Sequence, residues 1–220
     1  MSSCAIVVAA GSSRRMGFDK LAAPLAGVPV LRRSVEKFIA ASSVSSVVVV
    51  APQDRFDELL GGDFSKPVTR VDGGANRQDS VQNGLAAVPE GTTLVAIHDG
   101  ARPLVTPEAI DRCLAAAAEH GAAALARPVT ETLKRADADG LARESVDREL
   151  LWFMETPQCF QLPLIQRAYA EVNLCQLTVT DEVSAMEAIG IPTLLVDARA
   201  PNLKITHPSD LALAAALLNA

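Results

Sequence analysis

The sequence has few cysteines, and none is arranged for a disulfide framework. Its 220 residues contain only Cys4, Cys113, Cys159 and Cys175, which are far apart and form no Cys-x-x-Cys pair. We therefore expect reduced thiols in a cytoplasmic protein. No stretch of roughly 18 apolar residues is free of charges, and no basic segment precedes the first apolar run. We expect neither a membrane span nor a signal peptide.

Positive charge is also scarce. Lys and Arg number 20 against 26 Asp and Glu, so the net charge is -6 and nucleic acid is not an expected partner. The three histidines, His98, His120 and His207, are too far apart in sequence to suggest a metal cluster. A strongly basic loop in such a chain is informative because it contrasts with the acidic whole.

The apolar segments alternate between strand-like runs and amphipathic helices. We predict strands at 4–10, 47–51, 93–100, 122–129 and 192–197. We predict helices at 28–41, 52–60, 77–88 and 106–121, and from Thr180 and Ser209 onward. Thr106 would cap its helix and Gly121 would end it. The alternation indicates an α/β fold with a mostly parallel, twisted sheet and helices on both faces.

Residues 130–148 break this alternation. Two extended polar segments flank the turn sequence ADADG, which predicts a protruding β-hairpin arm. A single hairpin is marginally stable alone, so we expect the arm to pack on another surface, such as a second subunit. No repeat, low-complexity segment or long linker divides the chain. We expect a single domain over 1–220 with an arm at about 130–148.

The most distinctive segment is VVAAGSSRRMGFDK, which follows the first predicted strand. It matches neither a Walker loop nor a dinucleotide fingerprint, because Ser13 and Met16 stand at the later glycine positions. Gly11 frees the backbone to turn, so that its N–H groups can point at an anion. Basic side chains suit a polyphosphate, and the alternative is a solvated basic turn. The charge comes from Arg14, Arg15 and Lys20.

The segment HDGARP places Asp99 at the end of a buried strand, with Arg102 three residues on. A carboxylate there can hold Mg²⁺ against phosphate oxygens, or it can simply cap a turn. We expect His98 to pack in the core. Ligands bind beyond the carboxyl ends of parallel strands, so Asp99 and the Gly11 loop should face the same crevice.

Two further segments carry candidate binding groups. Gly73-Gly74 allows close backbone approach to a base edge, with Ser80 in the first turn of the next helix, but it is also an ordinary turn sequence. Lys204 stands between Leu203 and Ile205 in a short extended segment. A lysine so placed is expected to point at a specific partner rather than into solvent.

Together these segments resemble a known family. The motifs AAGSSRRMGFDK, GGANRQDSVQNGL, HDGARPLV, VTETLK, ETPQCF, TDEVSAMEAIG and NLKITHPSDLALA stand in the order found in the 2-C-methyl-D-erythritol 4-phosphate cytidylyltransferases, from about residue 5 to 215. The resemblance implies a Rossmann-like nucleotidyltransferase domain that acts as a homodimer through the arm. It also implies Mg²⁺ or another divalent cation, and a reaction of CTP with the polyol phosphate that releases pyrophosphate.

The resemblance also implies the site residues. The implied nucleotide-binding residues are Ala9, Ala10, Gly11, Arg15, Lys20, Gly74, Ala75, Arg77 and Ser80. The implied substrate-binding residues are Asp99, Arg102, Thr132, Arg148, Thr156 and Lys204, with Asp99 also the metal ligand. The implied catalytic residues are Arg15, Lys20, Arg148 and Lys204. The family usually has glycine where this chain has Ser13, and often an acidic residue at Ala75.

This chemistry needs no catalytic base, because a phosphate monoester with a second pKa of about 6 is already a dianion near neutral pH. The lack of a Ser-His-Asp set, a nucleophile elbow and a reactive cysteine motif agrees with that. Three alternatives remain open: a cytidylyltransferase for another polyol phosphate such as ribitol 5-phosphate, a guanylyl- or uridylyltransferase, and a nucleotide-binding regulator without turnover.

Overall fold

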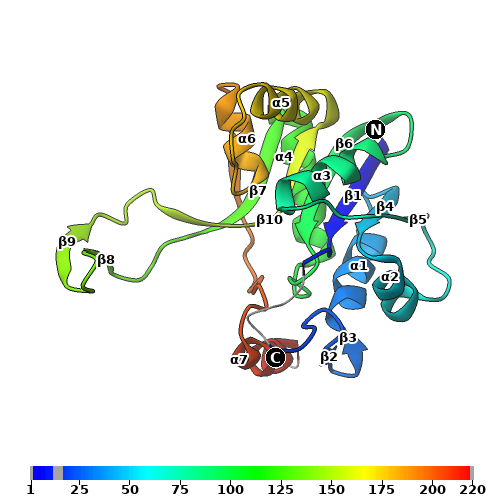
Figure 1. The fold of residues 1–220 in the computed structure, drawn as a ribbon, viewed down its shortest axis with the longest axis horizontal. Coiled ribbons are helices and arrows are strands. Elements are labelled where there is room, and N and C mark those ends of the chain that lie inside the picture. Colours follow the sequence, from blue (N-terminus) through cyan, green and yellow to red (C-terminus); the bar gives the residue numbers. More distant parts are fainter. Residues whose placement is uncertain (1, 12–16, 219–220) are drawn as a thin grey trace.

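The computed structural model describes residues 2–11 and 17–218, and its centre is a seven-stranded sheet in the order β11-β7-β10-β6-β1-β4-β5 (Figure 1). Neighbouring strands run parallel except β10, which is antiparallel to both β6 and β7. The mostly parallel α/β fold is therefore confirmed. The strands are β1 (Ser2–Val8), β4 (Ser46–Val50), β5 (Val68–Val71), β6 (Thr92–Asp99), β7 (Ala122–Pro128), β10 (Trp152–Gln161) and β11 (Leu194–Asp197).

Helices cover both faces of this sheet. They are α1 (Val30–Ala40), α2 (Gln53–Leu60), α3 (Arg77–Ala86), α4 (Pro107–His120), α5 (Leu162–Leu174), α6 (Glu182–Ala188) and α7 (Pro208–Leu218). Apolar side chains of α1, α2, α4 and α7 share one core cluster, and those of α3, α5 and α6 share the other. Within β1, Ala5 and Val7 face the first cluster and Cys4 and Ile6 the second, as the two-residue period of a strand requires.

Local signals explain where several elements begin and end. The Thr106 side chain accepts a hydrogen bond from the Ala109 N–H at 3.2 Å, and Gly121 ends α4 with φ at 87°. Both residues therefore act as the sequence predicts. The helix expected from Thr180 begins at Glu182, because the side chain of Asp181 is its cap. None of the helices within 2–11 and 17–218 is long and apolar enough to cross a membrane.

Three elements of the main body were not predicted from the sequence. The central strand β10 contains Pro157, a residue that normally argues against such a position. Its pairing with β7 is irregular between Met154 and Gln158, which accommodates the missing N–H donor. The helix α5 buries Ile165, Ala168, Tyr169 and Val172, whose spacing is helical. The third, β5, is a short strand at the edge of the sheet.

Two small hairpins complete the described chain. One pairs β2 (Pro24–Leu25) with β3 (Val28–Pro29) just before α1. The other pairs β8 (Leu133–Ala136) with β9 (Ala142–Val146) around the predicted turn, so the expected hairpin is present. Figure 1 shows β8 and β9 well apart from the sheet, at the end of two long connections. Most of the residues in this hairpin are exposed, because no apolar layer covers them.

Candidate active site

A crevice of about 570 Å³ opens beyond the carboxyl ends of the central strands. Its position follows from strand register, since Val8 at the end of β1 lies beside Asp99 at the end of β6. The loop after β1 and the end of β6 therefore share one edge, as expected for a parallel sheet. The predicted site residues that line the crevice are Ala9, Ala10, Gly11, Lys20, Gly74, Ala75, Arg77, Ser80, Asp99 and Lys204.

The loop after β1 is held from both sides. The Ala9 N–H donates to the Val50 carbonyl at 2.8 Å, which continues the sheet pairing for one more residue. From α2, the Arg55 guanidinium donates to the carbonyls of Ala9 and Gly11 and forms an ion pair with Asp19 at 2.9 Å. Arg55 thus fixes the chain on either side of the basic loop. The predicted phosphate ligand Arg15 lies outside the described residues.

Lys20 lines the crevice at the far end of that loop. Its ammonium donates to the Ile205 carbonyl at 2.8 Å, and the Ile205 N–H in turn donates to the Ala101 carbonyl at 2.8 Å. The segment that carries Lys204 is therefore connected both to the basic loop and to the chain after β6. This places two ammonium groups on the wall of one crevice, which suits a ligand with several phosphates.

The opposite wall of the crevice is formed by the backbone around Gly74, where small residues allow close packing. A Cβ at Gly74 would collide with the Cβ of Asp79, so only glycine fits. The Ser80 hydroxyl accepts from the Gly74 N–H at 3.0 Å and donates to the Asn76 carbonyl at 2.8 Å. The Asn76 side chain caps α3 by accepting from the Asp79 N–H at 2.9 Å. These contacts hold the turn in place at the wall of the crevice.

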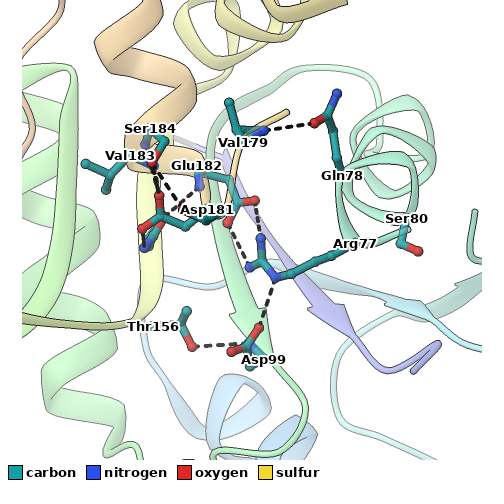
Figure 2. A network of polar contacts seen from close by, with 12 residues as sticks. Arg77, Gln78, Ser80, Asp99, Thr156, Val179, Asp181, Glu182, Val183 and Ser184 are labelled. Atoms are coloured by element: carbon teal, nitrogen blue, oxygen red, sulfur yellow. Dashed lines mark hydrogen bonds and ion pairs between the residues drawn. The ribbon is translucent and has the colours of Figure 1, made fainter. Parts of the chain in front are cut away.

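Asp99 forms ion pairs with two cationic side chains of the crevice. Its Oδ2 accepts from the Lys204 ammonium at 2.6 Å. Its Oδ1 accepts from Arg77 Nε at 3.3 Å, a contact that Figure 2 shows. The sequence predicts a specific partner for Lys204, and in this structure that partner is the Asp99 carboxylate. Burial disfavours the charged carboxylate, but the charges of Arg77 and Lys204 outweigh burial and hold the pKa of Asp99 well below its usual range.

Thr156 and Arg102 lie behind Asp99 rather than on the crevice wall. The Thr156 hydroxyl accepts from the Asp99 N–H at 3.1 Å and hydrogen-bonds His98 Nδ1 at 2.9 Å. The Arg102 guanidinium donates to the Asn202 carbonyl at 2.7 Å, and its Nε is 4.0 Å from Asp99 Oδ2. Their roles in substrate binding stay predictions, while their observed contacts position Asp99.

His98 is a core residue, as the sequence predicts. It is fully buried, packs against the Phe38 ring at 4.8 Å between centroids, and places Nε2 3.1 Å from the Arg102 carbonyl. Because a carbonyl only accepts, Nε2 carries the proton and Nδ1 accepts from Thr156. Burial lowers the pKa of His98 to about 4, which leaves the ring neutral near neutral pH.

Two predicted site residues, Thr132 and Arg148, lie in the arm. The structure does not bring them to the crevice of their own chain (Figure 1). The Arg148 guanidinium donates to the Thr130 carbonyl, so it is held against the other connection of the arm. Both side chains are exposed. If they bind substrate, they must do so at a surface other than this crevice.

The residues of the crevice fit a divalent cation held mainly by substrate. In 2–11 and 17–218 no three His, Cys, Asp or Glu side chains gather where they could bind a metal ion. Asp99 is the ionised carboxylate on the crevice wall. Mg²⁺ in nucleotide sites is usually bound by one or two carboxylates and substrate phosphates, a pattern that a single Asp99 can serve.

Sequence reasoning missed two groups that organise the site, Arg55 and Glu182. Arg55 lies in α2, where its sequence context is that of a surface helix, and only the fold brings it to the loop. Glu182 is buried and binds Arg77 through both carboxylate oxygens (Figure 2). A helix-starting acidic residue usually serves the helix dipole, so the sequence carried no signal for this contact.

A sheet covered on both faces, with lysines and a glycine turn lining a crevice beyond its carboxyl edge, suits an α/β protein that binds a phosphorylated ligand such as a nucleotide. A family model described as 2-C-methyl-D-erythritol 4-phosphate cytidylyltransferase matches residues 3–220. The enzyme of that name from Parasynechococcus marenigrum (strain WH8102) is 43% identical over 217 residues, which cover 97% of this chain and 96% of the relative. The chain belongs to this family, as its motifs indicated.

Solved structures agree with that assignment. The crystal structure of a 4-diphosphocytidyl-2C-methyl-D-erythritol synthase from Anaerococcus prevotii matches with a TM-score of 0.87 at 26% identity, covering 100% of this chain and 96% of the other. The 2-C-methyl-D-erythritol 4-phosphate cytidylyltransferase of Thermus thermophilus matches with a TM-score of 0.83 at 32% identity, and each chain is covered to 100%.

Proposed function

We propose that this protein transfers the cytidylyl group of CTP to 2-C-methyl-D-erythritol 4-phosphate, giving 4-diphosphocytidyl-2-C-methyl-D-erythritol and pyrophosphate. A single observation carries the proposal: Lys20, Lys204 and Asp99 line the same crevice as the rigid Gly74 turn. The turn offers a groove for a pyrimidine, and the charged groups suit two phosphate esters that must meet. Membership of the family supports the choice of substrates.

The proposed reaction is an in-line displacement at the α-phosphorus of CTP. An oxygen of the attacking phosphate forms the new P–O bond while the bond to the β-phosphate breaks, and pyrophosphate leaves with the electron pair. The attacking phosphate is already a dianion, so no residue has to remove a proton. The work of this chain is to bring two polyanions together and to stabilise the charge that grows between them.

Each charged residue has a proposed part. Lys20 and Arg15 bind the triphosphate and stabilise the leaving pyrophosphate, and Lys204 binds the attacking phosphate. Lys204 is bound to Asp99 at 2.6 Å in the structure, so it would exchange this partner for the phosphate when substrate arrives. Asp99 would hold Mg²⁺ or another divalent cation, which supplies a charge that neutralises phosphate oxygens.

The arm has a proposed role in a dimer. Residues 130–148 would extend from the single domain across a second subunit and bring Thr132 and Arg148 to the crevice of that subunit. This is supported by the exposure of both side chains and by the position of β8 and β9 well apart from the seven-stranded sheet (Figure 1).

The free cysteines agree with a cytoplasmic enzyme, since all four thiols are free and three are buried.

The experiment that tests the function is pyrophosphate release from CTP. We expect release only when both 2-C-methyl-D-erythritol 4-phosphate and a divalent cation are present. The matched assay replaces the alcohol with ribitol 5-phosphate, which we expect to be a poor substrate. Equal rates with both alcohols would refute the substrate choice, and CTP binding without any pyrophosphate release would indicate a regulator instead of an enzyme.

A further inference from the structure

An ion pair with a completely buried carboxylate joins α3 to α6 at the wall of the crevice (Figure 2). Glu182 is completely buried, and its two carboxylate oxygens accept from Arg77 Nη1 at 2.6 Å and Nη2 at 3.0 Å. The Tyr169 hydroxyl donates to the same carboxylate at 3.1 Å. Burial and the neighbouring Glu182 raise the pKa of Tyr169, so its hydroxyl stays protonated and remains a donor.

The position of Glu182 is fixed by its backbone. Gln158 of β10 accepts from the N–H groups of Glu182 at 3.0 Å and Val183 at 3.1 Å. The Gln158 amide also donates to Asp181 at 2.9 Å, and Asp181 caps α6 through the Ser184 N–H at 3.0 Å. The start of α6 is thereby anchored to the central strand, and the Glu182 carboxylate is a rigid acceptor.

The Nε–H group of Arg77 points toward Asp99 in the crevice. Its Nε donates to Asp99 Oδ1 at 3.3 Å, and the residue lines the crevice. Glu182 therefore occupies one N–H of each terminal nitrogen, while Nε donates to Asp99. Glu182 also compensates the charge of Arg77, so Asp99 keeps negative charge for its other partners, among them Lys204.

The location of the pair matters more than its strength. A buried ion pair is weak support for a purely stabilising role, because desolvation of both groups consumes most of the Coulombic gain. A pair of apolar side chains would attach α6 to α3 at least as well. A bidentate carboxylate, in contrast, fixes the plane of a guanidinium, which apolar packing cannot do.

We propose that Glu182 is a positioning residue of this enzyme: it orients Arg77 and compensates its charge, and Arg77 in turn fixes Asp99 in the crevice. The kinetic consequences rest on the proposed function, but the orientation of Arg77 does not. Glu182 does not line the crevice, so its effect on substrate passes through Arg77, which does.

The first test is a double-mutant cycle with Glu182→Gln, which removes the charge at nearly constant volume, and Arg77→Gln, which removes the guanidinium and its charge. We expect Glu182→Gln to lower kcat about tenfold or more, since a misplaced charge costs transition-state stabilisation. The double variant should be no slower than Arg77→Gln, because both changes act through one group. Multiplying effects would overturn the proposal. If Glu182→Gln does not fold, the double variant is compared with Arg77→Gln instead, because it leaves neither member of the pair charged and unpaired.

The matched control is Gln78→Ala. The Gln78 side chain accepts from the Val179 N–H at 3.3 Å, so it also joins α3 to the segment before α6, but without a charge (Figure 2). We expect a small loss of thermal stability and a kcat within about twofold of wild type. An equal fall of kcat in Gln78→Ala and Glu182→Gln would show that attachment of α6 alone matters.

A second readout follows Arg77 directly, through its Nε–Hε resonance in ¹H–¹⁵N spectra, assigned by its absence in Arg77→Gln. Glu182 does not touch Nε, so faster exchange of Hε with water in Glu182→Gln reports loss of the hydrogen bond from Nε to Asp99. Unchanged exchange of Hε would overturn the proposal whatever the kinetics. If the wild type releases no pyrophosphate from CTP, the proposed function fails, and this spectrum still decides whether Glu182 orients Arg77.

Discussion

The crevice and the arm place their charged side chains in opposite ways. In the crevice, Asp99 has Arg77 and Lys204 as partners at 3.3 and 2.6 Å, and the side chains of Asp99, Arg77 and Lys204 are 13%, 31% and 42% exposed. In the arm, the ion pair of Arg135 with Glu144 spans 3.4 Å between side chains that are 70% and 64% exposed. Burial defines the geometry of the first set, whereas water screens the second.

This difference indicates what each region needs in order to function. The side chains of the crevice are held by their own chain, since strand register and buried hydrogen bonds fix them before a ligand arrives. The arm has no apolar layer of its own, so burial within this chain does not fix Thr132 and Arg148, and another surface would have to cover them. A second subunit is the proposed surface, and the predictions below test whether the two regions divide their roles in this way.

The largest expected effect is that of Lys20→Ala in the crevice. We expect kcat to fall about 10²-fold or more, because a preorganised charge on the triphosphate is lost, with no change in folding. The control is Lys66→Ala, since Lys66 also donates to a backbone carbonyl, that of Ala41, but does not line the crevice. Steady-state kinetics at saturating CTP check this, and near-normal turnover of Lys20→Ala would remove it from the mechanism.

The next effect concerns nucleotide choice. The rigid turn around Gly74 and Ser80 suits a pyrimidine, so we expect kcat/KM for CTP to exceed that for GTP by at least about 10²-fold. Because the arm has no part in base recognition, Arg148→Ala should slow both nucleotides and leave this ratio unchanged. Competition assays measure the ratio. A ratio near one in the wild type, or one that Arg148→Ala changes, would contradict the assignment.

A smaller effect tests whether the arm crosses between subunits. Lys20→Ala and Arg148→Ala should each be nearly inactive, but a mixture should recover activity under subunit exchange. Random pairing gives about half heterodimers, each with one intact site, so recovery should approach roughly a quarter of wild type. Mass spectrometry verifies the exchange. An inactive mixture with proven heterodimers would mean that the arm serves its own chain.

The smallest effect is on stability. Arg135→Ala breaks an exposed ion pair of the arm and should leave Tm unchanged within about 1 °C. Leu31→Ala in α1 removes a completely buried side chain and should cost about 2–5 kcal/mol. Thermal unfolding followed by circular dichroism compares the two. A large fall in Tm for Arg135→Ala would show that the arm is part of the cooperative fold.

Much of the fold could be predicted because its signals are local. The buried run 47–51 and the Thr106 cap depend on neighbours a few residues away, and both were assigned correctly. The strand β10 could not be assigned in this way. Pro157 argues against a central strand, and only the irregular pairing of β10 with β7 makes it acceptable.

The same distinction between local signals and contacts made by the fold applies to the site. Its motifs identified the residues of the crevice wall, because glycine, lysine and aspartate after strands carry chemistry that is visible without coordinates. They did not reveal Arg55 or the carboxylate behind Arg77. The positions of Thr132 and Arg148 relative to a substrate also stay predictions, since the arm depends on a surface outside this chain.

Local patterns along the chain are enough to assign the alternation of strands and helices, the family, and the residues that can contact a nucleotide. The partners that hold those residues, and the charges beside them, follow from the fold. Arg77 and Glu182 are 105 positions apart, as are Asp99 and Lys204. The physical reason is that periodicity records which face of an element is buried, whereas an ion pair requires two distant elements to be docked in one register.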